Sequence, residues 1–435
     1  MRAALGLWWR LRRAEATGPA DARSLDLLAV LAYAVASGAL LITAGGVHAF
    51  WTRHAGTPTD TSAFYVVLAL TAAALLVVPI LTLGGVASRL CLGRRNARLA
   101  SLRLCGATSG QVGAMVLAES AHQAVLGALA GVGLYAAAIP CLSVVSFDRR
   151  PLAAAELWLG PALVLAVIAG VLLLALLSGL GSLGAVVVGP LGVAQRTTPG
   201  RLRAWRVAIG AGLLLLWIFG AQMLGQIGTA AVLAVLAAVV AAVNLAGPVF
   251  VQVAGRIYAR TARRAPGLIA ARRIVDDPRA TWRAVSSLGL AICLAALSSI
   301  SGAEANEPDG ATLAADMGTG ALIALAIVTA VAATSTGVVQ AARVIDQRNA
   351  YRDLALAGTP LAVLHRARLA EVGVPLLVTL ALGSILPILI LVPMSSLLGP
   401  GVFVRVLIAI AASVAVMLAS VQASRGLVTR YALAA

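Results

Sequence analysis

The feature that most constrains this chain is a succession of long apolar runs. Crossing the hydrocarbon core of a bilayer, roughly 30 Å, takes about 20 predominantly apolar residues in a helix. Stretches such as LLVVPIL are continuous, whereas the strands of a transmembrane β-barrel alternate over about ten residues. The chain is 61% hydrophobic and only 11% charged, so we predict an all-α polytopic membrane protein. Ten runs are long enough to span: 25 to 50, 64 to 88, 112 to 139, 161 to 188, 206 to 222, 228 to 252, 284 to 302, 318 to 340, 369 to 393 and 401 to 423.

Arginine sets the predicted orientation. All 33 basic residues are Arg, and with the N-terminus inside only four of them face outward: Arg53, Arg149, Arg150 and Arg405. This distribution follows the positive-inside rule, with both termini cytoplasmic. The net charge of +17 therefore reflects topology and contact with membrane lipids. Because the Arg residues are dispersed over several loops, no nucleic-acid partner is expected.

The runs and loops divide the chain into four predicted segments. Residues 1 to 24, which include Trp8 and Trp9, suit an amphipathic segment lying on the inner membrane surface. Residues 25 to 188 hold four helices, 189 to 283 two linking helices with basic cytoplasmic loops, and 284 to 435 four more helices. The predicted layout is thus 4+2+4. The outer loops are short and leave no room for a large extracellular module.

One segment occurs twice. Residues 95 to 119 read RNARLASLRLCGATSGQVGAMVLAE, and residues 348 to 371 read RNAYRDLALAGTPLAVLHRARLAE. The copies align at a constant offset of 252 from Leu102 and Leu354 to Glu119 and Glu371. An even number of predicted spans separates them, so both enter the membrane with the same polarity. This is a parallel internal repeat about an axis along the membrane normal.

Each copy predicts a short cytoplasmic helix, a sharp turn and a helix entering the membrane. Gly106 and Gly358 suit the left-handed conformation that ends helices. Thr108 and Thr359 offer hydroxyls to cap the next helix, and Pro360 suits its first turn. Such a paired element can bear on a symmetric cytoplasmic partner. An ordinary basic loop is the alternative.

The stretch LRLCGATSGQVGAMVLAE resembles the FtsX-like permease motif of ABC transporters, and LALAGTPLAVLHRARLAE resembles it more weakly. The resemblance implies a MacB-type architecture, in which paired ATPase subunits dock on cytoplasmic coupling helices. It places Glu119 and Glu371 at the following helix entrances. Many members carry a large extracytoplasmic domain, and this chain has only short loops there. The implied coupling residues are Arg98, Leu102, Arg103, Gly106, Ala107, Thr108, Arg352, Leu354, Gly358, Thr359 and Pro360.

The chain contains no Lys, so it has no P-loop. We therefore expect a non-enzymatic chain without a cofactor of its own, with ATP and Mg²⁺ bound by two partner ATPase subunits. The resemblance implies a permease in the bacterial cytoplasmic membrane that exports or extracts an amphipathic or lipid-like substrate, such as an antimicrobial peptide or antibiotic. The alternative is an ATPase-coupled regulator, for example of cell-wall hydrolases, without net transport. An intramembrane enzyme is disfavoured, because no catalytic constellation is visible.

Four further patterns have two interpretations each. Glu119 and His122, spaced as in ExxH, suit metal ligands or a polar cluster at the membrane boundary, and we favour the cluster and no metal. GLGSLG at 179 to 184 suits helix packing rather than dinucleotide binding. The acidic loop 303 to 310 suits a solvated turn more than a cation site. Polar residues within the spans suit interhelical hydrogen bonds more than a transport pathway: Asn244, Gln252, Thr334, Ser335, Thr336 and Gln340.

Overall fold

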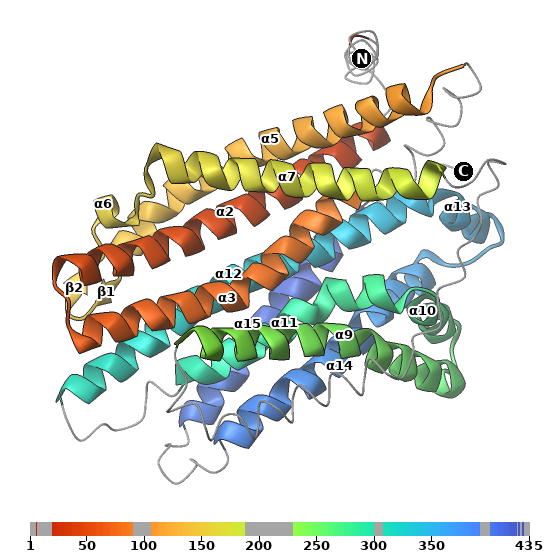
Figure 1. Ribbon diagram of the computed structural model, residues 1–435. Helices are drawn as coiled ribbons and strands as arrows, with labels where there is room; N and C mark the ends of the chain where they lie inside the picture. The colour runs from red at the N-terminus through yellow and green to blue at the C-terminus, as the bar shows by residue number, and fades with distance from the viewer. Residues whose placement is uncertain are drawn as a thin grey trace.

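The computed structural model describes Gly6 and residues 20–89, 106–187, 229–299, 308–391, 401–423, 425–426 and 429 (Figure 1). A first group of long helices comprises α2 (Ala20–Gly56), α3 (Asp60–Arg89), α5 (Ser109–Ser143) and α7 (Gly160–Val187). A second comprises α11 (Pro278–Ser299), α12 (Pro308–Asp346), α14 (Leu361–Leu391) and α15 (Gly401–Ala423). The others are α9 (Thr229–Thr261), α10 (Ala265–Asp276) and α13 (Arg348–Leu356).

The apolar runs that the structure describes form helices, and the chain is an all-α polytopic membrane protein. Within the described residues, six helical stretches are long and apolar enough to cross a membrane: Ser24–Gly56, Asp60–Ser88, Gly110–Ser143, Ala154–Leu180, Ala315–Ile345 and Leu361–Ser384. The runs at 228 to 252, 284 to 302 and 401 to 423 coincide largely with α9, α11 and α15. The run at 206 to 222 lies outside the described residues, as does 1 to 19 apart from Gly6. Ten spans in a 4+2+4 layout therefore stay a prediction.

The two groups of helices pack in similar ways. α2 contacts α3, α5 and α7, and α11 likewise contacts α12, α14 and α15. The helices α5 and α14 begin at Ser109 and Leu361, which are 361 − 109 = 252 residues apart, the offset of the sequence repeat. α12 crosses to contact α2 and α3, so it joins the groups. The two groups therefore share a pattern of helix contacts.

Glycines let α5 and α7 approach their neighbours. A Cβ on Gly127 would lie 2.3 Å from the Tyr33 Cβ, and one on Gly131 would lie 2.0 Å from the Ser37 Oγ, both in α2. Gly179 of α7 would meet Leu117 of α5 at 3.4 Å. Small residues at such contacts allow close packing in lipid. GLGSLG lies inside α7, not at a strand-to-helix turn, so its packing interpretation holds.

The loops predicted at 140 to 160 and 253 to 283 contain more structure than expected. The first holds a hairpin of β1 (Ser146–Phe147) and β2 (Arg150–Pro151), then the short helix α6 (Ala154–Leu157). The second holds the end of α9 and all of α10, whose buried face consists of Gly267, Ala270, Ala271 and Ile274. α10 is too polar to be predicted as a membrane span, so the search for long apolar runs did not identify it as a helix.

These additional elements lie at opposite ends of the bundle (Figure 1). We call the end with β1, β2 and α6 the outer end, and the end with α10 and α13 the inner end. Helices such as α12, with 39 residues, are about 58 Å long and therefore extend beyond a hydrocarbon core of about 30 Å. The ends of the bundle are the parts that reach water and soluble partners.

Candidate functional site

At the inner end, α13 is joined to α14 by a tight turn. Gly358 has φ = 84°, in the left-handed region that glycine adopts without steric cost. Its N–H donates to the Ala355 carbonyl, and the Thr359 N–H donates to the Leu354 carbonyl, both at 2.9 Å. These two bonds form a Schellman motif, which satisfies the last carbonyls of α13. The predicted short helix and left-handed Gly358 are therefore both confirmed.

Pro360 differs slightly from its predicted position. Since α14 begins at Leu361, Pro360 lies just before the helix rather than within its first turn. Its carbonyl accepts from the Val363 N–H at 2.9 Å, and its ring is exposed. Proline still suits the site, because a residue there needs no N–H donor.

α13 has an inward face and an outward face. Tyr351 is buried, and Leu354 is half-buried and packs against the main core of the bundle. Arg352 and Leu356 are exposed, and 67% of the Leu356 surface is accessible. The leucine available to a partner is therefore Leu356, while Leu354 anchors the helix.

The first copy of the repeat is described only from Gly106 onward. Gly106 has φ = 91°, as predicted, and Ala107 is half-buried. The Thr108 Oγ1 accepts from the Gln111 N–H at 3.3 Å, and the Gln111 Oε1 accepts from the Thr108 N–H at 3.0 Å. This capping box starts α5 and confirms Thr108 as a helix cap. The remaining predicted residues of this copy lie outside the described residues: Arg98, Leu102 and Arg103.

Four side chains form what we call the inner cluster: Arg273, Arg343, Tyr351 and Glu371. Only 3% of the Glu371 side chain is exposed, and its carboxylate forms an ion pair with Arg343 of α12. The Arg273 Nη1 of α10 donates to the Glu371 Oε2 at 3.4 Å and to the Tyr351 hydroxyl at 3.0 Å. The Arg273 guanidinium also lies 5.3 Å from the centre of the Tyr351 ring. The inner cluster thus ties α10, α12, α13 and α14 together.

Electrostatics in this cluster favour the charged form of Arg273. A buried carboxylate is costly unless it is paired and hydrogen-bonded, and two guanidinium groups compensate Glu371. Burial lowers the pKa of Arg273, but the neighbouring Tyr351 and Glu371 raise it more, so the pKa lies above the ordinary value for arginine. Arg273 is therefore charged throughout the physiological range. Glu371, which the sequence analysis placed at a helix entrance, is thus paired with two arginines.

The polar pair of the first copy lies on α5. Glu119 and His122 are both half-buried, one helical turn apart. On the same helix, the Gln123 Nε2 donates to the Asp26 Oδ1 of α2 at 2.7 Å. In the described part of the chain, no group of three or more His, Cys, Asp or Glu side chains is arranged to hold a metal. Gln123, next to this pair on the same helix, thus links α5 to α2.

Polar residues in the middle of α12 are buried between helices. Thr336 is fully buried, and its Oγ1 donates to the Ala284 carbonyl of α11 at 2.6 Å. Ser335 and Gln340 are 4% and 3% exposed. None of these three side chains lines the cavity described next. Interhelical hydrogen bonding, the favoured interpretation, is confirmed for Thr336.

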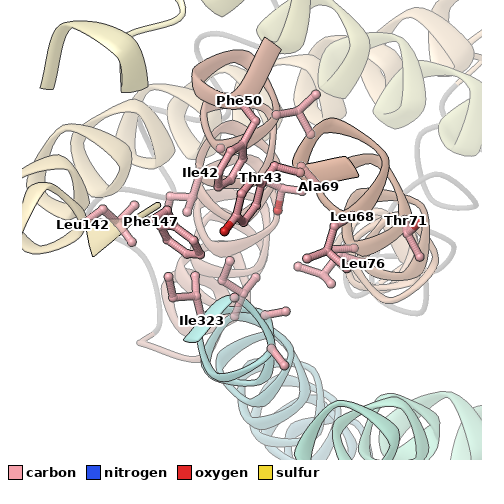
Figure 2. A pocket seen from close by; sticks show the side chains of 18 of the residues that line it. Ile42, Thr43, Phe50, Leu68, Ala69, Thr71, Leu76, Leu142, Phe147 and Ile323 are labelled. Atoms are coloured by element: carbon pink, nitrogen blue, oxygen red, sulfur yellow. The ribbon is translucent and has the colours of Figure 1, made fainter. Parts of the chain in front are cut away.

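Near the outer end, a cavity of about 140 Å³ separates the two groups of helices. α2 and α3 form one side, α12 forms another, and Leu142, Phe147, Leu152 and Leu157 close the outer end. Figure 2 shows side chains from these elements converging on one space, with Thr43 of α2 and Ile323 of α12 among them.

We call residues 146–157, which comprise β1, β2 and α6, the outer cap. Its apolar side chains Phe147, Leu152 and Leu157 are buried with Ala49 and Tyr65 in a small core. The turn between the strands places Asp148 and Arg149 at φ = 55° and 58°, as a tight type I′ hairpin requires. The outer cap therefore forms the roof of the cavity.

Arg53 at the end of α2 fastens the outer cap. Its Nε donates to the Glu156 Oε2 at 2.9 Å, and its Nη2 donates to the Pro151 carbonyl at 2.7 Å. Its Nη1 donates to the Phe147 carbonyl at 3.3 Å. One guanidinium thus contacts both strands and α6.

A second attachment comes from the other group of helices. The Asp316 Oδ2, near the start of α12, accepts from the Tyr65 hydroxyl at 2.5 Å and from the Asp148 N–H at 2.7 Å. Asp316 is 9% exposed. It therefore joins α12 to α3 and to the outer cap across the entrance of the cavity.

Sequence reasoning placed Arg53 on the outer side but did not connect it to Glu156, and it did not identify Asp316. Tyr65 and Asp316 are 251 residues apart, and no local sequence pattern predicts that they form a hydrogen bond. Aspartate at the tip of a short polar loop is a hairpin signal, although the usual Gly is missing after Asp148.

Comparisons with protein-family models, curated proteins and solved structures find no match to this chain.

Proposed function

We propose that this chain is the transmembrane permease subunit of an ABC transporter of the FtsX-like, MacB-type family. A separate pair of ATPase subunits binds ATP and Mg²⁺ and docks on the inner end. The full sequence has no Lys and so no P-loop, which supports a motor on another polypeptide. The chain itself catalyses no reaction in this proposal.

The observation that carries the proposal is the helix–turn–helix of α13 and α14. Its outward residues Arg352, Leu356 and Pro360 are exposed, as a docking surface requires. Its inward residue Tyr351 contacts Arg273, which also contacts Glu371. A force applied to α13 is therefore transmitted directly to α10 and α14. A loosely attached basic loop would not have this property.

α12 provides the route from the inner end to the outer end. It bears Arg343 of the inner cluster and Asp316 of the outer attachment, and 343 − 316 = 27 residues of helix span about 40 Å. A tilt of α12 at its inner end thus displaces Asp316, which contacts Tyr65 and the outer cap. In this way, ATP-driven closure of the ATPase pair at the inner end changes the contacts around the cavity near the outer end.

The substrate we propose is amphipathic or lipid-like, for example an antimicrobial peptide or antibiotic, which the transporter exports or extracts. The apolar cavity between the two groups of helices supports this class. The site of action is the bacterial cytoplasmic membrane, with both termini cytoplasmic. The arginines of α10 and α13 at the inner end support this orientation.

A second function has its own supporting observation. The outer cap is a small folded element bonded to α12 through Asp316. A movement of α12 would therefore move the outer cap, which lies outside the membrane in this proposal. A regulator of cell-wall hydrolases would use such a movement. Reconstituted vesicles distinguish the two functions, since ATP-dependent flux of a substrate requires transport and a regulator produces none.

The test is co-purification of the full chain with candidate ATPase subunits, followed by ATPase assays. We expect Leu356→Asp to weaken assembly and to reduce stimulated hydrolysis at least about tenfold, because a charge is placed in an apolar contact. The matched control is Leu268→Asp, which changes an exposed leucine of α10 at the same end. Failure of the wild-type chain to recruit any ATPase would refute the proposed function. Recruitment unaffected by Leu356→Asp would refute the docking surface alone.

A further inference from the structure

The side chains that line the cavity near the outer end are almost all apolar. Its lining includes three hydroxyl-bearing side chains: Thr43, Thr71 and Tyr65. The Thr43 Oγ1 donates to the Ala39 carbonyl and the Thr71 Oγ1 to the Val67 carbonyl, both at 2.8 Å. Tyr65 donates to Asp316. The hydroxyl donors are thus all occupied within the protein, and the lining offers water little beyond the acceptor lone pairs of these three oxygens.

The size of the cavity suits a hydrocarbon group. An engineered apolar cavity of roughly 150 Å³ in another protein binds benzene, and this one measures about 140 Å³. Its outer part is aromatic, with Phe50 stacked on Tyr65 and perpendicular to Phe147. Its inner part is aliphatic, with Leu76 of α3 and Ile327 of α12 among the lining residues. A section of an alkyl chain matches both parts.

Among the described residues around the cavity, charged side chains lie at its outer boundary. Arg53, Glu156 and Asp316 surround the outer cap, directly beyond the apolar lining. An amphiphile with its chain in the cavity would therefore place its polar end among charged and backbone groups. The reverse orientation would bury the polar end among leucines.

We propose that this cavity binds a hydrocarbon chain of a lipid-like amphiphile, with the outer cap as its lid. The bound chain contacts α2 and α3 on one side and α12 on the other. The affinity of the cavity for the chain therefore depends on the position of one group of helices relative to the other. That this amphiphile is the transported substrate rests on the proposed function. Binding itself requires no ATPase.

Two glycines allow the cavity to be filled. A Cβ on Gly46 of α2 meets nothing within 4 Å, and one on Gly320 of α12 meets only Phe147, at 3.8 Å. Gly46→Leu and Gly320→Leu thus place side chains in the space from opposite walls without a backbone clash. The matched control is Gly170→Leu in α7, where a Cβ also meets nothing within 4 Å and the residue is exposed.

The experiment uses the purified full chain in lipid nanodiscs and palmitic acid carrying a diazirine in its chain. After irradiation, labelled peptides are mapped by mass spectrometry. We expect labels on cavity residues of α2, α3 and α12 that excess hexadecane removes. Gly46→Leu and Gly320→Leu should each lower this labelling roughly tenfold or more, and Gly170→Leu should leave it unchanged. Thermal unfolding of each variant verifies that it is folded, and one folded cavity variant suffices.

Labelling confined to outward-facing residues would overturn the inference, as would cavity labelling that survives both filling variants. Loss of labelling in Gly170→Leu as well would also overturn it, since the effect would then be unspecific. The two proposals fail separately. A chain that recruits no ATPase but is labelled in the cavity refutes the proposed function alone, and a chain that recruits one without cavity labelling refutes the binding site alone.

Discussion

The inner and outer ends of this molecule are held together by different physical means. At the inner end, Glu371 is almost completely buried and is paired with Arg273 and Arg343. At the outer end, the corresponding ion pair of Arg53 with Glu156 is 19% and 30% exposed. Beneath it lies the apolar cavity between α2, α3 and α12.

The difference bears on how each end responds to force. Breaking a buried ion pair leaves an uncompensated charge and costs about 3–5 kcal/mol, whereas an exposed pair contributes about 0–1 kcal/mol. The inner end is therefore rigid and suited to receive force from a partner. At the outer end, the ion pair breaks at a lower cost in free energy, and the cavity has space for a ligand. Removing the attachments one at a time tests this contrast.

The largest effect is expected for Glu371→Ala. The change leaves Arg273 and Arg343 without their shared carboxylate, at side-chain exposures of 21% and 23%. Because the buried carboxylate is lost but both arginines keep some access to solvent, we expect the free energy of unfolding to fall by about 2–3 kcal/mol. The measurement is thermal or denaturant unfolding of the purified full chain in detergent.

The matched control for this prediction is Glu156→Ala, which removes the carboxylate of the outer ion pair. Its expected effect is about 1 kcal/mol or less, because that pair is partly exposed to solvent. Equal losses for the two variants would show that the ends do not differ. Glu371→Leu combined with Arg343→Leu should recover part of the loss, since apolar replacement removes the unpaired charge.

An intermediate effect is expected for Asp316→Ala. The variant leaves the Tyr65 hydroxyl and the Asp148 N–H without their acceptor, at a cost of about 1–3 kcal/mol. Because Asp316 holds the outer cap to α12, amide hydrogen exchange should rise in residues 146–151 and stay constant in α13. Asp60→Ala is the control, an exposed carboxylate at the same end. Equal protection of the hairpin in Asp316→Ala and wild type would contradict the role of Asp316.

The helices and turns of this fold could be predicted because their causes are local. Continuous apolar runs predict spans, Gly106 and Gly358 predict left-handed turns, and GLGSLG predicts close helix packing. Each of these signals lies within a few residues of the structure that it specifies.

The outer end could not be predicted, because its contacts are long-range. β1 and β2 have two residues each, too few to show any periodicity. Tyr65 and Asp316 meet only because α3 and α12 pack together. Leu354 shows the same limit at the inner end, since amphipathic spacing did not reveal that it faces the core and Leu356 faces outward.

The smallest effect is expected for Arg53→Lys, which keeps the charge but removes the guanidinium that contacts both strands and α6. A lysine ammonium cannot satisfy Glu156 and the Pro151 carbonyl in the same fork geometry. We expect a loss of less than about 1 kcal/mol, because the pair is partly exposed. Hydrogen exchange of the hairpin should rise slightly, and the difference from wild type should shrink as salt screens the pair. The control Arg150→Lys changes an exposed arginine of the same hairpin and should have no effect. A loss for Arg53→Lys as large as that for Glu371→Ala would mean that the outer end is as rigid as the inner end, and the contrast between them would be wrong.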